Sequence, residues 1–164
     1  MPAALPNPRL AIFLPSADST AQMAEICAQH LGAGDTVLLS GPVGAGKSHF
    51  ARALIRAHFG MDQEVPSPSF TLVQCYTNPQ IEIWHADLYR LSHSGEIAEL
   101  GLDDAMGTAL CLIEWPDRLG PFAPKSALEI TLAPQSEGRS AQISGANAPL
   151  CAALISAFPQ LLEQ

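Results

Sequence analysis

The chain carries Gly41-Pro42-Val43-Gly44-Ala45-Gly46-Lys47-Ser48, which is a complete G-x-x-x-x-G-K-S phosphate-binding loop. The β-rich run Thr36–Ser40 precedes it, and Phe50, Leu54 and Ala57 follow it at helical spacing. Between a strand and a helix, such a loop turns its amides toward an anion, Lys47 neutralises the outer phosphates and the Ser48 hydroxyl reaches Mg²⁺. The context therefore favours a phosphate site over a glycine-rich turn without a ligand.

Length, composition and charge leave few protein classes open. With 164 residues, 48% of them hydrophobic, the chain can bury one core but not the cores of two ordinary domains. We therefore expect a loose, proline-bearing arm over residues 1–9 and a single domain over residues 10–164. The net charge of −8, with only eight Lys and Arg, argues against a protein that holds nucleic acid by itself.

The cysteines and the start of the chain indicate a compartment. Cys27, Cys75, Cys111 and Cys151 are far apart and sit in apolar stretches, which is typical of core thiols in a reducing environment. No run approaches the length of a membrane span, and residues 1–9 lack the charged start and apolar stretch of a signal peptide. We expect a cytoplasmic protein with no membrane contact.

Hydrophobic patterns predict the remaining elements. Strands are expected at residues 10–14, 36–40, 70–76, 81–85, 109–114, 126–132 and 139–144, and helices at residues 16–31, 47–60, 95–100, 102–106 and from 149 onward. The connection 61–68 is polar, contains proline and has no periodicity, which predicts mobility. Because residues 77–80 have the composition of a turn, the strands beside them should form a hairpin. The fold class is therefore α/β, like a P-loop NTPase: a mixed sheet with a parallel centre, antiparallel flanking strands and helices on both faces.

Three further positions belong with a bound nucleotide. Glu114 ends five apolar residues, so it is the Walker B candidate that would hold Mg²⁺ and orient an attacking water, unless it is a solvated strand end. Asp87, just past the second hairpin strand, could complete the water shell of the metal or merely cap a turn. Ser67-Pro68-Ser69-Phe70-Thr71 lies where a switch segment would sense the outer phosphate, although alone it is only a proline turn.

Four ordered motifs carry a family resemblance. Residues 41–48, 67–73, 85–91 and 112–116, in this order and spacing, resemble the TsaE (YjeE) family. Its members are bacterial P-loop ATPases needed for threonylcarbamoyl modification of the adenosine beside the anticodon in tRNA. The similarity runs from about Leu14 to Ser144 and includes the Gly138-Arg139 turn.

The resemblance implies specific site residues and partners. The implied nucleotide-binding residues are Gly41, Val43, Gly44, Ala45, Gly46, Lys47, Ser48 and His49, and the implied catalytic residues are Lys47, Asp87 and Glu114. It implies ATP as the nucleotide, Mg²⁺ on Ser48 and Glu114 with Asp87 assisting, and roles for Trp115 and the switch segment in activity. It also implies TsaD-like and TsaB-like partner subunits that perform the transfer. From the charge, we expect no strong direct binding of tRNA.

Two residues depart from the family pattern, and one contact stays open. Pro42 stands where the family usually has an acidic residue, and it has no N–H to offer a phosphate. Ser48 replaces the usual Thr but keeps the hydroxyl that Mg²⁺ needs. Asp18 or Thr20 is a candidate contact to the adenine.

Rival activities share the loop. A GTPase would need an N-K-x-D motif, but the only lysine besides Lys47 is Lys125, within Pro124-Lys125-Ser126. A small-molecule kinase would need an arginine-rich lid, whereas the arginines here are scattered singly. A regulatory module that senses ATP without hydrolysing it is the third alternative.

Overall fold

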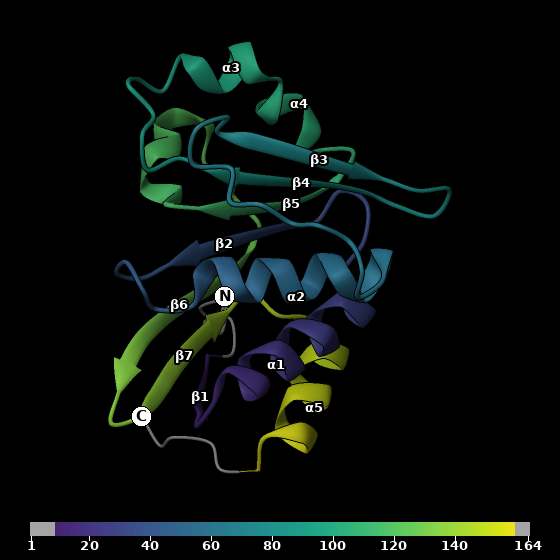
Figure 1. The fold of residues 1–164 in the computed structure, drawn as a ribbon, viewed down its shortest axis with the longest axis vertical. Helices are drawn as coiled ribbons and strands as arrows, with labels where there is room; N and C mark the ends of the chain where they lie inside the picture. Colours follow the sequence, from purple (N-terminus) through teal and green to yellow (C-terminus); the bar gives the residue numbers. More distant parts are fainter. Residues whose placement is uncertain (1–8, 160–164) are drawn as a thin grey trace, which may run out of the picture.

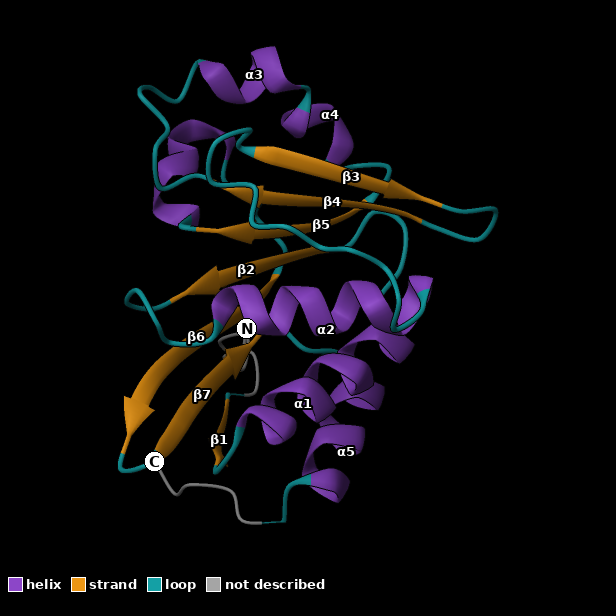
Figure 2. Ribbon diagram, in the orientation of Figure 1, coloured by secondary structure: helices purple, strands orange, loops and turns teal. Residues whose placement is uncertain are grey.

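Seven strands form one mixed sheet in the computed structural model, which describes residues 9–159 (Figures 1 and 2). The strand order is β1-β7-β6-β2-β5-β4-β3. The strands are β1 (Leu10–Leu14), β2 (Thr36–Ser40), β3 (Val73–Thr77), β4 (Glu82–Asp87), β5 (Leu110–Glu114), β6 (Leu128–Gln135) and β7 (Gly138–Ser144). Strand β2 pairs in parallel with β5 and β6, and β4 pairs in parallel with β5. The pairs β1–β7, β6–β7 and β3–β4 are antiparallel, so the predicted fold class is confirmed.

Helices cover the two faces of the sheet unequally. The helices are α1 (Ala17–His30), α2 (Lys47–Phe59), α3 (Glu96–Leu100), α4 (Leu102–Ala105), α5 (Ala148–Ala157) and the 3₁₀ segment η1 (Pro116–Phe122). Helices α1, α2 and α5 share the larger hydrophobic core with the inner faces of the strands, whereas α3, α4 and η1 pack on the opposite face of β2, β5 and β4. In Figure 1, α3 and α4 lie above β3, and α2, α1 and α5 lie below β2. Every residue of the central strand β5 is buried.

Alternation along β5 fixes which face each side chain joins. Leu110 and Leu112 belong to the core under α2, and Cys111 and Ile113 belong to the core under α3 and α4. Successive side chains of a strand point to opposite faces, so Glu114 continues the α2 side. The same period places His85 and Asp87 of β4 on that side, after Ile83. The strand register thus brings these polar groups to the start of α2.

Turn chemistry explains where the predicted boundaries were wrong. Strand β3 begins at Val73 rather than Phe70, because Leu72 has φ 66°, its N–H donates to Pro68 O, and Leu72 O accepts from Asp87 N. Residues 70–72 are therefore a turn. Strand β4 starts and ends later than predicted, so that Asp87 is its last residue. The segment η1 was not predicted.

Two apolar side chains that were expected on the buried faces of their helices are exposed instead. Ala57 is exposed, and Ala51 and Ile55 complete the buried face of α2 instead. Ile155 is exposed on α5, where Asn147 caps the helix by accepting from Leu150 N at 2.9 Å. These helices bury a narrower stripe than their full apolar content allows.

The cysteines follow the prediction except at the sheet edge. Cys27, Cys111 and Cys151 are buried, while Cys75 is exposed on the edge strand β3. Burial raises the pKa of the Cys27 and Cys111 thiols to about 12, so both behave as small hydrophobes. Most of the predicted arm 1–9 lies outside the described residues, and the division into arm and single domain stays a prediction. Within residues 9–159, no helix has both the length and the apolarity to cross a membrane.

Candidate functional site

The phosphate loop joins the end of β2 to the start of α2, as predicted. Gly41 has φ 137°, and a Cβ on it would meet Leu132 O of the neighbouring strand at 2.1 Å. Gly46, with φ 104°, leads directly into the helix. Both positions require glycine, one because β6 approaches so closely and one because the backbone is left-handed. The N-terminus of a helix that begins at Lys47 therefore faces the concave side of the loop.

Lys47 is held at the mouth of this loop by backbone carbonyls. Its Nζ donates to Gly41 O at 2.6 Å and to Pro42 O at 2.9 Å, and lies 4.3 Å from the centre of a Trp115 ring. Burial lowers the pKa of Lys47, and the charges of Glu114 and Asp87 oppose that shift. An ammonium group has three donors, so one remains for a ligand. Pro42 lacks an N–H, but its carbonyl also accepts from Ala45 N at 3.1 Å.

Arg139 of β7 fixes the loop from the other side. Its Nε donates to Ala45 O at 3.2 Å, and its Nη2 donates to Gly44 O at 3.1 Å. Within a trans peptide unit the N–H points away from the C=O, so holding the Ala45 carbonyl turns the Gly46 amide in the opposite direction. Sequence reasoning placed Arg139 in a family turn and gave it no role here. It lies 94 residues from Ala45, and only the strand order reveals the contact.

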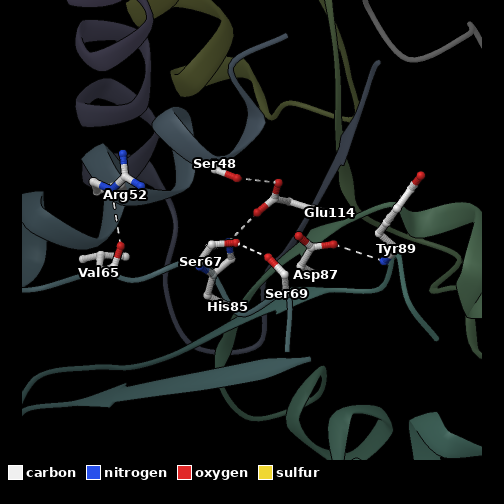
Figure 3. A network of polar contacts seen from close by, with 9 residues as sticks. All are labelled: Ser48, Arg52, Val65, Ser67, Ser69, His85, Asp87, Tyr89 and Glu114. Atoms are coloured by element: carbon white, nitrogen blue, oxygen red, sulfur yellow. Dashed lines mark hydrogen bonds and ion pairs between the residues drawn. The ribbon is translucent and has the colours of Figure 1, made fainter. Parts of the chain in front are cut away.

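Glu114 lies directly beside the start of α2, with both carboxylate oxygens engaged (Figure 3). Ser48 Oγ donates to Oε1 at 2.9 Å, and His85 Nε2 lies 2.7 Å from Oε2. Glu114 is only 2% exposed, which rules out a solvated strand end. The predicted meeting of Glu114 with the loop serine is therefore present in the fold, and His85 adds a contact that the sequence did not indicate.

Asp87 faces Glu114 across the β4–β5 pair. The two residues are register partners, and Asp87 Oδ1 accepts from Tyr89 N at 3.1 Å (Figure 3). Asp87 thus caps a turn and also lines the cavity, and its metal role stays a prediction. Burial is the main cause that raises its pKa and Glu114 adds to it, whereas the Tyr89 N–H, His85 and Lys47 oppose the rise.

These side chains line one cavity of about 450 Å³, within the usual range for ligand pockets of about 300–1,000 Å³. The predicted residues that line it are Val43, Gly44, Gly46, Lys47, Ser48, His49, Ser67, Ser69, Asp87, Glu114 and Trp115. Tyr89 and Arg90 line it as well and were not singled out from the sequence. Of the remaining predicted residues, Gly41, Ala45, Pro68, Phe70 and Thr71 do not line it. A hydroxyl and two carboxylates at the end of a phosphate loop fit Mg²⁺, which takes few protein oxygens and completes its shell with phosphates and water.

The switch segment 67–71 forms the outer wall of this cavity. Ser67 Oγ and Ser69 Oγ lie 2.7 Å apart, whereas Thr71 Oγ1 accepts from Gln74 Nε2 at 3.0 Å on the far side. Phe70 is 85% exposed, with the Arg90 guanidinium 4.8 Å from its ring centre. Of the hydroxyls in the switch segment, those of Ser67 and Ser69 therefore line the cavity.

The stretch before the switch segment is tied to α2. Arg52 Nε donates to Val65 O at 3.3 Å (Figure 3), and Arg56 Nε donates to Gln63 O at 3.1 Å. Val65 is buried in the main core. Contacts thus anchor the first part of the predicted mobile connection, and they stop before Ser67.

Trp115 also lines this cavity. Its backbone has φ 59°, a left-handed conformation that bulky residues rarely adopt. Its ring centre lies 5.0 Å from that of Tyr89. The turn after β5 thereby puts an aromatic face over Lys47. The activity role implied for Trp115 stays a prediction.

A second cavity of about 240 Å³ adjoins the first at Gly46 and His49. Helix α1 and the β6–β7 hairpin line it, with Thr20 on one side and Glu137 and Arg139 on the other. His49 Nε2 lies 3.0 Å from Ala17 O and joins the two helices. Of the two candidate adenine contacts, Thr20 lines this cavity and Asp18 does not.

Known proteins resemble this chain in sequence and in fold. A family model described as Threonylcarbamoyl adenosine biosynthesis protein TsaE matches residues 14–142. Proteins named tRNA threonylcarbamoyladenosine biosynthesis protein TsaE are 39% identical in Rickettsia bellii, over 73% of this chain and 83% of the relative, and 31% identical in Bacillus subtilis, over 70% and 72%. The crystal structure of YdiB from Bacillus subtilis shares the fold, with a TM-score of 0.75 at 24% identity over 94% of this chain and 99% of that one.

Proposed function

This chain belongs to the TsaE family of threonylcarbamoyladenosine biosynthesis in tRNA, and we propose that it serves there as a Mg²⁺-dependent ATPase that is not itself the transferase. The observation that carries the proposal is the Ser48–Glu114 contact at the end of the phosphate loop, with Asp87 beside it and Lys47 above the same cavity. Hydroxyl, carboxylates and ammonium are the set that Mg²⁺-nucleotide hydrolysis requires.

Each group has a distinct task in this proposal. The loop amides and the free donor of Lys47 hold the phosphates, and the Ser48 hydroxyl and Glu114 carboxylate hold Mg²⁺, with Asp87 ordering its water shell. The bound metal would neutralise charge on the phosphate oxygens. Glu114, buried and fixed on two sides, would also orient the attacking water. Ser67 and Ser69 would reach the outer phosphate once the switch segment closes.

We assign the base to the cavity beside His49. This space begins where the loop ends, so a nucleotide with its phosphates on Gly44–Ser48 can extend into it. Thr20 and the Glu137–Arg139 hairpin line it with polar groups. The guanine-specific N-K-x-D motif is absent from the sequence, which supports adenine as the base.

The partners follow from the family and from charge. TsaD-like and TsaB-like subunits would perform the transfer, with this chain docking through the cavity rim, where Phe70, Tyr89 and Val43 are exposed. A chain of net charge −8 should bind tRNA weakly on its own, because phosphate neutralisation supplies most non-specific affinity. Pull-down from cell extract in ATP, followed by a tRNA mobility-shift assay with the isolated chain, tests both statements. A cytoplasmic location stays a prediction.

One incubation separates this proposal from its rivals. The protein is mixed with ATP and Mg²⁺, with and without candidate phosphate acceptors, beside Glu114→Gln as the matched variant. Hydrolysis by the wild type, with bound nucleotide but at least about 100-fold less phosphate released by the variant, supports the ATPase. Phosphorylated acceptor would indicate a small-molecule kinase, and binding without turnover would indicate an ATP sensor. Arg52, Arg56 and Arg139 bind backbone carbonyls, which leaves little for a kinase lid.

A further inference from the structure

His85 and Glu114 form the most deeply buried polar contact at the site. His85 Nε2 lies 2.7 Å from Glu114 Oε2, and the two side chains are 1% and 2% exposed. Removing an imidazole and a carboxylate from water costs free energy that a single hydrogen bond recovers only in part. An aliphatic pair would fill the same space at lower cost, so the contact invites an explanation beyond packing.

The two nitrogens of His85 are used unequally. A carboxylate oxygen only accepts, so Nε2 carries the hydrogen that it donates to Glu114. Nδ1 is equally buried and has no partner among the described residues. A histidine selected for core polarity would satisfy both nitrogens. The strand instead directs one nitrogen at one oxygen of Glu114.

This contact fixes the orientation of the carboxylate. The terminal torsion of glutamate is broad, so an unrestrained carboxylate would rotate. Ser48 holds Oε1 on the side of the phosphate loop, and His85 holds Oε2 on the side of β4. Ser48 and Oε1 lie where the metal is proposed, so His85 is the restraint on the carboxylate that comes from outside that site. Asp87, two residues along β4, faces the same cavity.

We propose that His85 is a positioning residue, which holds Glu114 so that Oε1 faces the metal beside Ser48. The inference rests on the proposed Mg²⁺-nucleotide function. Partners that orient metal ligands typically contribute about 10–100-fold in metal affinity, which sets the size of the expected effect. His85 does not line the cavity, so the binding of nucleotide without metal should not depend on it.

Two amide substitutions of similar polarity separate the two ring positions. The amide nitrogen of His85→Gln reaches roughly the position of Nε2, whereas that of His85→Asn reaches only the position of Nδ1. Calorimetry measures ADP binding in EDTA and over a Mg²⁺ titration, and thermal unfolding checks each variant. Tyr76→Phe is the matched control, because it removes another buried, unpartnered polar atom on the same core without touching Glu114.

The expected result is a selective loss. His85→Asn binds ADP in EDTA within about twofold of wild type but needs at least about tenfold more Mg²⁺ for the metal-dependent gain, while His85→Gln and Tyr76→Phe keep the wild-type requirement. A folded His85→Asn with wild-type Mg²⁺ dependence overturns the inference alone. A folded His85→Gln that loses this dependence also overturns it, and this variant carries the test if the asparagine variant fails to fold. No Mg²⁺ effect in the wild type overturns the proposed function as well.

Discussion

The phosphate loop and the switch segment both line the cavity of about 450 Å³, and they are held in place to different degrees. On one side, Lys47 and Arg139 bind four carbonyls of the phosphate loop, and β6 packs against Gly41. On the other, the Ser67 and Ser69 hydroxyls bond to each other, Phe70 is 85% exposed, and only Pro68 of the switch segment is buried. The phosphate loop is therefore held by more side-chain contacts than the switch segment.

This difference separates binding from turnover. A preformed loop spares the ordering cost of binding, so affinity for the nucleotide should be a property of the isolated chain. Closing the switch segment over the outer phosphate has to order exposed residues, which another protein surface can do. The contrast predicts that damage to the loop affects affinity, while damage to the switch segment affects hydrolysis.

The largest effect should come from Lys47→Ala. Removing a charge that faces phosphates, together with two bonds that hold the loop, should weaken ATP binding at least about 100-fold, which is about 3 kcal/mol. Calorimetry measures the affinity, with Lys125→Ala, the exposed second lysine, as the control. Near-normal affinity in Lys47→Ala would remove the phosphate assignment.

Arg139→Met should loosen the phosphate loop without removing a residue of its motif. Losing two charge-assisted hydrogen bonds to the loop should reduce ATP affinity about tenfold. Arg118→Met is the control, since that arginine contacts Leu91 O away from the loop. An affinity equal to wild type would mean that the loop keeps its shape without β7.

The phosphate loop could be predicted from the sequence far better than the switch segment. Gly41–Ser48 is local, so spacing alone identified it, and the apolar run before Glu114 indicated a buried strand. Phe70–Leu72 looked like a strand because the residues are β-formers, but the Pro68 carbonyl captures Leu72 N and makes a turn. Local propensity cannot register such a contact.

Long-range contacts account for what the sequence missed at the site. Arg139 and His85 meet their partners only because β7 lies beside β6 and β4 beside β5, and single-sequence patterns do not give strand order. The motif identified Asp87 as a candidate site residue. The strand was predicted to end at residue 85, but β4 ends two residues later, at Asp87.

The double variant Ser67→Ala, Ser69→Ala should leave ATP affinity within about twofold of wild type while slowing hydrolysis. The two hydroxyls bond to each other in the nucleotide-free protein, so their removal costs the resting cavity little. Calorimetry and phosphate release are measured on the same preparation. A tenfold loss of affinity would show that the switch segment is as preformed as the loop, and would break the comparison.

The smallest effect is expected at Asp87, which lines the cavity. Because burial raises the pKa of Asp87, the folded protein binds its proton more readily than the unfolded chain does, so stability falls as pH rises above the ordinary carboxyl value. Metal-free Asp87→Asn should therefore unfold about 1–3 °C higher at pH 7, with a gain that shrinks toward about pH 4. Thermal unfolding in EDTA tests this against exposed Asp117→Asn. Equal melting of Asp87→Asn and wild type at pH 7 would remove the buried charge from the account.

Phosphate release by the wild-type chain, titrated with its TsaD-like and TsaB-like partners, tests the division between binding and turnover most directly. With the loop preformed and the switch segment loosely held, isolated turnover should be slow, near or below about 1 per second. Partner docking should raise it at least about tenfold, and the complex should be tighter in ATP than in ADP. Unchanged turnover at saturating partner, with the complex verified by sedimentation, would contradict the account.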